Sequence, residues 1–153
     1  MATRDYFAEL YVAGFMGDDG WNIYFPKRDV GFDFIATKTI DGNIIIRPVQ
    51  VKGLYPSEAK KDKVGYGYVG NLTQIHPDMA LVLPYFPTDR RGAAPDCIAF
   101  MPRCEIKSQA SRGYKCFPAR FLAGAAVPRE SFKKYFGFEG MRYMESPKWS
   151  VGG

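Results

Sequence analysis

The feature that most constrains the fold is an Asp41-Gly42 pair between two largely apolar segments, residues 31–39 and 43–52. Asp-Gly favours a two-residue turn that joins antiparallel strands, and such a turn pairs Ile40 with Asn43. The sequence therefore predicts a long β-hairpin early in the chain. We expect the strand pairs of this hairpin to follow from the turn, because turn length sets the register.

Counting back along both strands from the turn places Asp33 directly opposite Gln50. Opposed residues have Cβ atoms about 4.5–5.5 Å apart. Strand side chains alternate in direction, so Gln50 and Lys52 point to one face and Val51 to the other. The hairpin is thus predicted to gather a carboxylate, an amide and an ammonium group, a set suited to a divalent cation and a phosphate.

Pro48 interrupts this pattern, because a proline cannot donate a hydrogen bond to a strand ladder. Its presence predicts either an edge position or a β-bulge in the second strand. A bulge would shift the residue-by-residue pairing but would leave Gln50 and Lys52 on one face.

An amphipathic helix is predicted at the start of the chain, with Thr3 as its cap and Asp5 in its first turn. Glu9 lies beside its apolar stripe, at the edge of the buried surface. The stripe consists of residues at helical spacing: Tyr6, Phe7, Leu10, Ala13 and Gly14.

Apolar runs predict further strands, and a proline predicts a second helix. We expect strands at 21–25, 79–86 and 97–101, a short helix over 129–136 after Pro128, and an irregular tail from Gly137. Residues 105–127 carry scattered basic and aromatic side chains with no clear period. The fold class is therefore predicted as α/β, with a mixed central β-sheet flanked by helices.

The size and charge of the chain set further bounds. Its 153 residues fit one domain over 1–153, and a net charge of +5 favours anionic partners such as nucleic acid. No apolar run approaches the ~20 residues of a membrane span, and the start of the chain lacks the apolar core of a signal peptide. The three cysteines show no metal-binding spacing and are expected as reduced, buried thiols of a soluble, cytoplasmic protein.

Several catalytic schemes lack their sequence signatures. There is no GxSxG motif and no Gly-rich phosphate loop followed by Lys-Ser/Thr, so we expect no bound nucleotide cofactor. His76 is the one histidine, and its Ile-His-Pro context predicts a structural or surface role.

Two other segments have an acid two residues before a lysine. Glu58 and Lys60 lie in a charged loop with no partner strand, which predicts a solvated surface. Glu105 and Lys107 follow Asp96, but the apolar run 97–101 would separate the two acids by about 30 Å at ~3.3 Å per residue. The hairpin is the favoured site.

Glu9, Asp33 and the Gln50-Val51-Lys52 tripeptide resemble the signature of the PD-(D/E)xK nuclease superfamily, in particular its Holliday-junction-resolvase-like and Mrr-like branches. The resemblance covers about the first 85 residues. It implies a restriction-endonuclease-like core, ordered as helix, three strands, helix and strand, over about residues 3–103, with 104–153 as a C-terminal extension. Gln50 stands where the superfamily usually has an acid.

The resemblance also implies a function and a role for each site residue. It implies hydrolysis of DNA phosphodiester bonds with Mg²⁺ or Mn²⁺, and a homodimer in members that cut both strands. Asp33, the Gln50 amide, the Val51 carbonyl and Glu9 would hold the metal, and Lys52 would act on the water or the scissile phosphate, with Gln50 and Glu9 assisting.

Basic and aromatic residues near this site are candidates for contact with nucleic acid. Tyr55, Tyr66 and Tyr68 either stack on exposed bases or serve in packing. The candidate phosphate contacts are Lys27, Arg28, Lys60, Lys61, Lys63, Arg90 and Arg91. Two other functions remain open: a nuclease-like domain that binds nucleic acid without cutting it, and a protein-interaction module.

Overall fold

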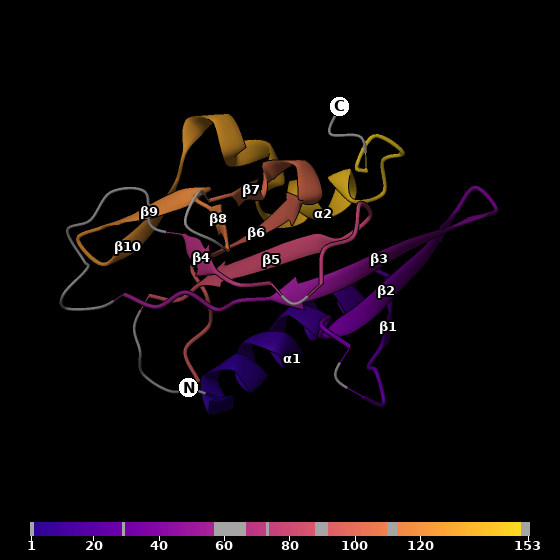
Figure 1. The fold of residues 1–153 in the computed structure, drawn as a ribbon, viewed down its shortest axis with the longest axis horizontal. Helices are drawn as coiled ribbons and strands as arrows, with labels where there is room; N and C mark the ends of the chain where they lie inside the picture. Colours follow the sequence, from indigo (N-terminus) through magenta and orange to yellow (C-terminus); the bar gives the residue numbers. More distant parts are fainter. Residues whose placement is uncertain are drawn as a thin grey trace.

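The chain folds as a mixed α/β protein around a five-stranded mixed sheet (Figure 1). The computed structural model describes residues 2–28, 30–56, 67–72, 74–87, 92–109 and 113–150. Helix α1 comes first, and the sheet has the order β1-β2-β3-β5-β6. These elements are α1 (Ala2–Asp18), β1 (Asn22–Tyr24), β2 (Phe34–Ile40), β3 (Asn43–Val51), β5 (Ala80–Tyr85) and β6 (Cys97–Pro102).

Two smaller sheets and short helices complete the fold. One sheet has the order β4-β8-β7, and the other pairs β9 with β10. Their strands are β4 (Tyr68–Gly70), β7 (Lys107–Ser108), β8 (Tyr114–Cys116), β9 (Ala119–Leu122) and β10 (Ala125–Pro128). The helices are the 3₁₀ segments η1 (Arg103–Glu105) and η2 (Glu130–Tyr135) and the α-helix α2 (Gly137–Tyr143).

The predicted hairpin is confirmed from its turn to the pair Phe34 and Val49. Ile40 pairs with Asn43, and the register continues without a break along β2 and β3. Asp41 and Gly42 both have positive φ, 51° and 81°, as a two-residue turn of this type requires. The hairpin extends away from the rest of the molecule at the right of Figure 1.

Pro48 lies in β3 without a bulge, so that alternative was wrong. It pairs with Ile35 in the continuous ladder to β2. The parallel ladder to β5 begins only at Val49, so no β5 residue faces Pro48 and no ladder bond is lost on that side. At Pro48, β3 is thus paired only with β2, as an edge strand is. From Val49 onward, β3 is paired on both sides.

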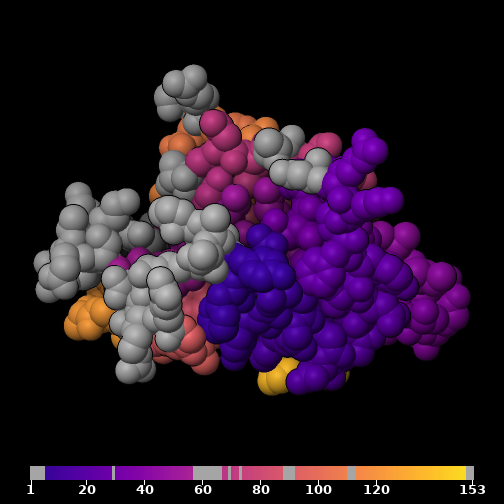
Figure 2. Space-filling view, turned by 90° about the horizontal axis from the view of Figure 1, so that it is seen from below, coloured from indigo at the N-terminus to yellow at the C-terminus, as the bar shows by residue number. Residues whose placement is uncertain are grey.

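Helix α1 packs on one face of the sheet through Ala8, Val12, Ala13 and Met16, all buried. The predicted stripe was wrong at all positions but Ala13, because its other four residues are exposed: Tyr6, Phe7, Leu10 and Gly14. The helix also begins at Ala2, so Thr3 lies inside it rather than at its cap. Seen from the side of α1, the helix borders the purple β1–β2 segment (Figure 2). No helix in the described ranges, α1 included, is long and apolar enough to cross a membrane.

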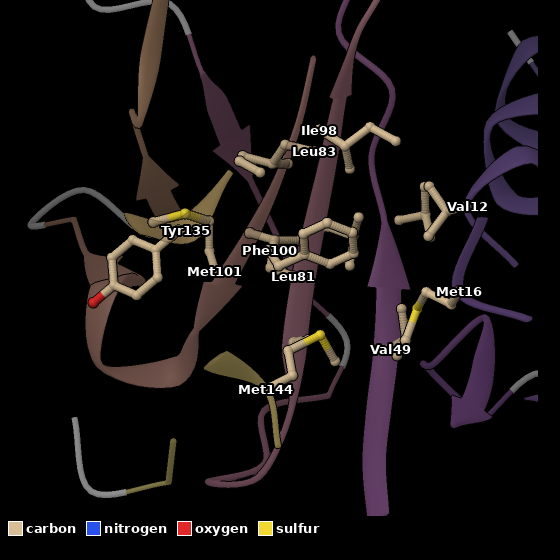
Figure 3. Close-up of a cluster of buried hydrophobic side chains, with 14 of the residues drawn as sticks. Val12, Met16, Val49, Leu81, Leu83, Ile98, Phe100, Met101, Tyr135 and Met144 are labelled. Atoms are coloured by element: carbon tan, nitrogen blue, oxygen red, sulfur yellow. The ribbon is translucent and has the colours of Figure 1, made fainter. Parts of the chain in front are cut away.

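The two faces of the sheet follow from the register. Val51, Val82 and Phe100 form one row across β3, β5 and β6, and the Phe100 ring stacks on Phe15 of α1 at 6.4 Å. Gln50, Leu81 and Met101 form the neighbouring row, which must point the other way. Val12 and Met16 lie on one side of the strands, and Met101 and Tyr135 lie on the other (Figure 3).

The C-terminal part differs most from expectation. The helix predicted over 129–136 is a 3₁₀ segment, and the tail predicted to be irregular from Gly137 forms α2. Residues 105–127, left unassigned, supply β7 to β10. Side chains of this part join the same buried cluster as the central sheet: Phe121, Tyr135, Met141, Met144 and Trp149.

Candidate functional site

Asp33 lies just before β2, where it is tied to the end of β3 by two hydrogen bonds. Its backbone N–H donates to the Val49 carbonyl oxygen at 2.8 Å, and its Oδ2 accepts from the Val51 N–H at 2.6 Å. The predicted direct pairing with Gln50 was therefore wrong, because the ladder ends at Phe34. The carboxylate nevertheless lies beside the Gln50-Val51-Lys52 segment, held by a short charge-assisted bond.

Gln50 is buried on the face away from α1, next to Leu81 of β5. Only 7% of its surface is exposed, and its Oε1 has no hydrogen-bond partner within the described part of the chain. An unpaired buried acceptor costs about 1–3 kcal/mol. A protein can retain such a cost at a position where the oxygen binds a ligand.

Lys52 is anchored through its backbone and covered by an aromatic ring. Its N–H donates to the Val82 carbonyl oxygen at 3.0 Å, and its Nζ lies 5.7 Å from the centre of the Tyr68 ring. Burial raises the pKa of Tyr68, whose hydroxyl donates to the Asn71 carbonyl oxygen at 2.9 Å. This contact places Tyr68 beside Lys52. The sequence predicted either packing or base stacking for this tyrosine.

Glu9 reaches the same end of the sheet from the other side. A β-carbon built on Gly53 would lie 3.2 Å from the Ala8 Cβ, so this turn of α1 touches the chain just after Lys52. Glu9 is half-buried, but its helix packs on the face opposite to Gln50. Glu9 is therefore the candidate ligand that the fold brings least directly to the others.

The residues fit a hard, oxygen-seeking cation only as a mixed set. No group of three or more His, Cys, Asp or Glu side chains gathers within the described ranges. The oxygens present are those of the Asp33 carboxylate, which accepts the Val51 N–H, and the Gln50 Oε1, which has no partner in the described ranges. Mg²⁺ is commonly held by one or two carboxylates, with waters completing its shell, so this set fits such an ion.

Two of the predicted nucleic-acid contacts can be placed. Lys27 and Arg28 are exposed in the link between β1 and β2, a few residues before Asp33. Tyr55 stacks on Phe86 with ring centroids 4.7 Å apart, which favours its packing role. Five contacts and one tyrosine lie outside the described residues: Lys60, Lys61, Lys63, Arg90, Arg91 and Tyr66.

The rival segment of Asp96, Glu105 and Lys107 does not form a second site of this kind. Strand β6 separates Asp96 from Glu105, whose Oε2 accepts a hydrogen bond from the Tyr135 hydroxyl at 3.0 Å. Lys107 lies on the exposed strand β7. Glu58 and Lys60 fall outside the described residues.

The cysteines and the histidine give no nucleophilic site. Cys116 is buried, Cys97 is half-buried and Cys104 is exposed, so the expectation of three buried thiols was only partly right. Burial raises the pKa of the Cys97 and Cys116 thiols to about 12, which keeps both protonated. The Nδ1 of His76 accepts the Asp78 N–H at 3.0 Å, a structural role in a turn.

Arg47 is the other buried polar residue, and its contacts are structural. Its guanidinium donates to the carbonyl oxygens of Met144, Ile46 and Ser146 at 2.9–3.2 Å. Burial lowers its pKa, and the negative charge of Asp78 opposes that effect. Arg47 thus fastens the hairpin to the C-terminal segment.

No protein-family model matches this chain, and a comparison with curated proteins also gives no match.

Proposed function

We propose that this chain is a metal-dependent DNA endonuclease with a restriction-endonuclease-like core. One observation carries the proposal: at the end of β3, the Asp33 carboxylate is bonded to the Val51 N–H, between Lys52 and a buried Gln50 whose Oε1 has no partner among the described residues. A carboxylate, a neutral oxygen and a cation on one short segment suit a metal-bound phosphodiester better than they suit a packing role.

The order of elements supports the proposal. A helix is followed by three antiparallel strands and then by β5, which runs parallel to β3. The helix implied between Lys52 and Met79 is not present in residues 67–72 or 74–79, where β4 forms instead. Residues 57–66 lie outside the described ranges.

Each residue has a role in the proposed mechanism. The Asp33 carboxylate, the Gln50 Oε1 and the Val51 carbonyl oxygen would hold the cation, and Glu9 would contribute through a water molecule. Such a cation would supply Lewis-acid polarisation of the phosphoryl oxygen and a lowered pKa of the attacking water. Lys52 orients that water or stabilises charge on the phosphate, and the Tyr68 ring limits where its ammonium can lie.

Gln50 itself favours a second candidate function. An amide supplies no negative charge, so Asp33 is the one carboxylate that the described residues bring to the Gln50-Val51-Lys52 segment. A nuclease-like domain that binds nucleic acid without cleaving it fits this reduced charge.

Cleavage of plasmid and branched DNA with Mg²⁺ or Mn²⁺ tests the proposal. We expect cleavage by the natural protein, none after chelation with EDTA, and a loss of about 10²–10³-fold in Lys52→Ala, the scale of removing one electrostatic stabiliser. Asp33→Ala is expected to lose at least as much.

Matched controls are available for both variants. Asp18 and Lys148 are exposed, so Asp18→Ala and Lys148→Ala make the same charge changes elsewhere. Activity that persists in Asp33→Ala and Lys52→Ala rejects the site. Salt-dependent binding with no cleavage by the natural protein supports the non-cleaving candidate instead.

A further inference from the structure

The small sheet β4-β8-β7 places two lysines directly opposite each other. Lys107 of β7 pairs with Lys115 of β8, and both side chains are exposed. Like charges at directly opposed positions destabilise a sheet. The two neighbours of Lys115 along β8 are Tyr114, which is half-buried, and Cys116, which is buried. Because side chains alternate along a strand, the lysines lie on the outer face of this sheet.

Protection of a sheet edge explains only half of this pair. A lysine on an edge strand discourages pairing with another chain, and β7 is an edge strand. Lys115, however, lies on the central strand β8, where no edge needs protection.

The internal partners of the two lysines leave positive charge at the surface. The Lys107 Nζ donates to the Cys104 carbonyl oxygen at 2.7 Å, and within the described ranges it has no carboxylate as a counter-ion. Lys115 forms no ion pair with any residue that the structure describes. Glu105 is an acid close to this sheet in sequence, and one of its oxygens accepts the Tyr135 hydroxyl.

Two arginine–aromatic contacts flank the same sheet, and the first involves Tyr114, on the face opposite to the lysine pair. The Arg103 guanidinium lies 5.9 Å from the Tyr114 ring, and the Arg129 guanidinium lies 5.2 Å from the Phe132 ring. Arg129 also donates to the Phe117 carbonyl oxygen at 2.7 Å, next to the end of β8. These are the scattered residues of 105–127 and their neighbours, gathered by the fold.

The sheet adjoins the candidate active site through β4. Tyr68 pairs with Cys116 of β8 and covers the Lys52 ammonium. Strands lie about 4.8 Å apart, so the lysine pair is on the order of 5–10 Å across the sheet from β4. Tyr68 shares the face of its partner Cys116, so the Lys52 ammonium and the lysine pair lie on opposite faces of this narrow sheet. A nucleic acid that contacts both must pass around the edge of the sheet.

We propose that the outer face of β4-β8-β7, centred on Lys107 and Lys115, binds the sugar–phosphate backbone of the nucleic acid. This deepens the proposed function, on which it rests, by naming a second surface that contacts the substrate outside the candidate site. The two lysines are one strand spacing apart at the backbone, so their long side chains can reach one phosphate or two neighbouring phosphates of one strand, whose charges recur every ~3.4 Å of helix axis. Such contacts give affinity without sequence readout.

The test is the salt dependence of DNA binding by Lys107→Gln/Lys115→Gln, measured by fluorescence anisotropy in EDTA so that no cleavage occurs. Each lost phosphate contact lowers the slope of log K against log salt by about 1, so the double variant should lose about 2. Lys133→Gln/Lys148→Gln removes the same charge from exposed positions and should keep the natural slope.

A second measurement excludes a folding defect. Because the opposed charges are removed, the double variant should melt at the natural temperature or above it. An unchanged slope, an equal loss in the control variant, or no DNA binding by the natural protein would overturn the proposal. So would a lysine-dependent affinity for phosphatidylserine vesicles alongside unchanged DNA binding.

The outcome is separable from that of the proposed function. If the natural protein binds DNA with the expected lysine dependence but never cleaves, the binding surface stands and the nuclease proposal fails. If it cleaves but the slope does not depend on Lys107 and Lys115, the reverse holds.

Discussion

Gln50 is buried, and its Oε1 has no hydrogen-bond partner among the described residues. Burying an acceptor in this way costs free energy of folding. Its neighbour in the row, Leu81, is fully buried and apolar, as is Met101. A methionine at position 50 would match that surrounding at nearly the same volume. The glutamine is therefore better explained by ligand binding than by packing.

Gln50→Met separates these two explanations. We expect the free energy of unfolding in EDTA to stay the same or to rise by about 1–3 kcal/mol, since an unpaired buried acceptor is removed. The stabilisation that Mn²⁺ confers on the natural protein should disappear. Urea unfolding with and without Mn²⁺ measures both. A loss of more than ~1.5 kcal/mol in EDTA exceeds the cost of a volume-conserving swap and would show a structural role for the amide.

The same residues show what the sequence could predict about the site. The turn at Asp41-Gly42 fixes the register, so the meeting of Asp33 with the Gln50-Val51-Lys52 segment was predictable. The contact itself was not, because β2 ends at Phe34 and the carboxylate turns to the Val51 N–H instead. Tyr68 had no local signal, since its strand pairs only with a segment far along the chain.

At the scale of elements, predictability followed strand length and composition. Strands β2, β3, β5 and β6 are apolar and at least six residues long, so their pattern is visible. Strands β7 to β10 have two to four residues, too few to show alternation. The missed helix α2 contains two glycines and has no side-chain cap at its start.

Strand β4 depends on one close approach that Gly67 permits. A β-carbon there would lie 2.1 Å from the Cys116 carbonyl oxygen and 2.7 Å from the Phe117 Cα, both backbone atoms. We expect Gly67→Ala to push β4 away from β8 and to cost about 1–3 kcal/mol, as overpacking does. It should also lower DNA cleavage, because Tyr68 would leave Lys52.

Gly14→Ala is the matched control for that variant. Nothing lies within 4 Å of a β-carbon on Gly14, which is in the middle of α1, so alanine should stabilise the protein by roughly 0.5–1 kcal/mol. Thermal melting compares the two. Equal melting temperatures for Gly67→Ala and the natural protein would mean that β4 does not need this approach.

In the whole molecule, the C-terminal segment is joined to the central sheet by polar contacts as well as by packing. The Trp149 Nε1 donates to the Met79 carbonyl oxygen at 3.0 Å, and the Ser150 hydroxyl bonds the Asp78 carboxylate. Lys38 of β2 forms ion pairs with Asp19 after α1 and with Glu145 after α2. These contacts connect both ends of the chain to the hairpin that carries the candidate site.

The molecule is therefore expected to unfold as one cooperative unit, and its two tryptophans can test this. Trp21 follows α1 and Trp149 lies in the C-terminal segment, both buried. Trp149→Phe leaves Trp21 as the fluorescent reporter and removes the hydrogen bond to Met79. This should lower the free energy of unfolding by about 1–3 kcal/mol, and each kcal/mol should lower the melting temperature by about 2–4 °C. Because the loss is shared by a single unit, the Trp21 fluorescence and the far-ultraviolet circular dichroism should shift together to one lower midpoint.

Trp21→Phe is the complementary variant. Its unfolding, followed by the fluorescence of Trp149, should also coincide with the transition in circular dichroism. If Trp21 keeps its natural midpoint while circular dichroism shows an earlier step, the C-terminal segment unfolds separately and cannot support the hairpin.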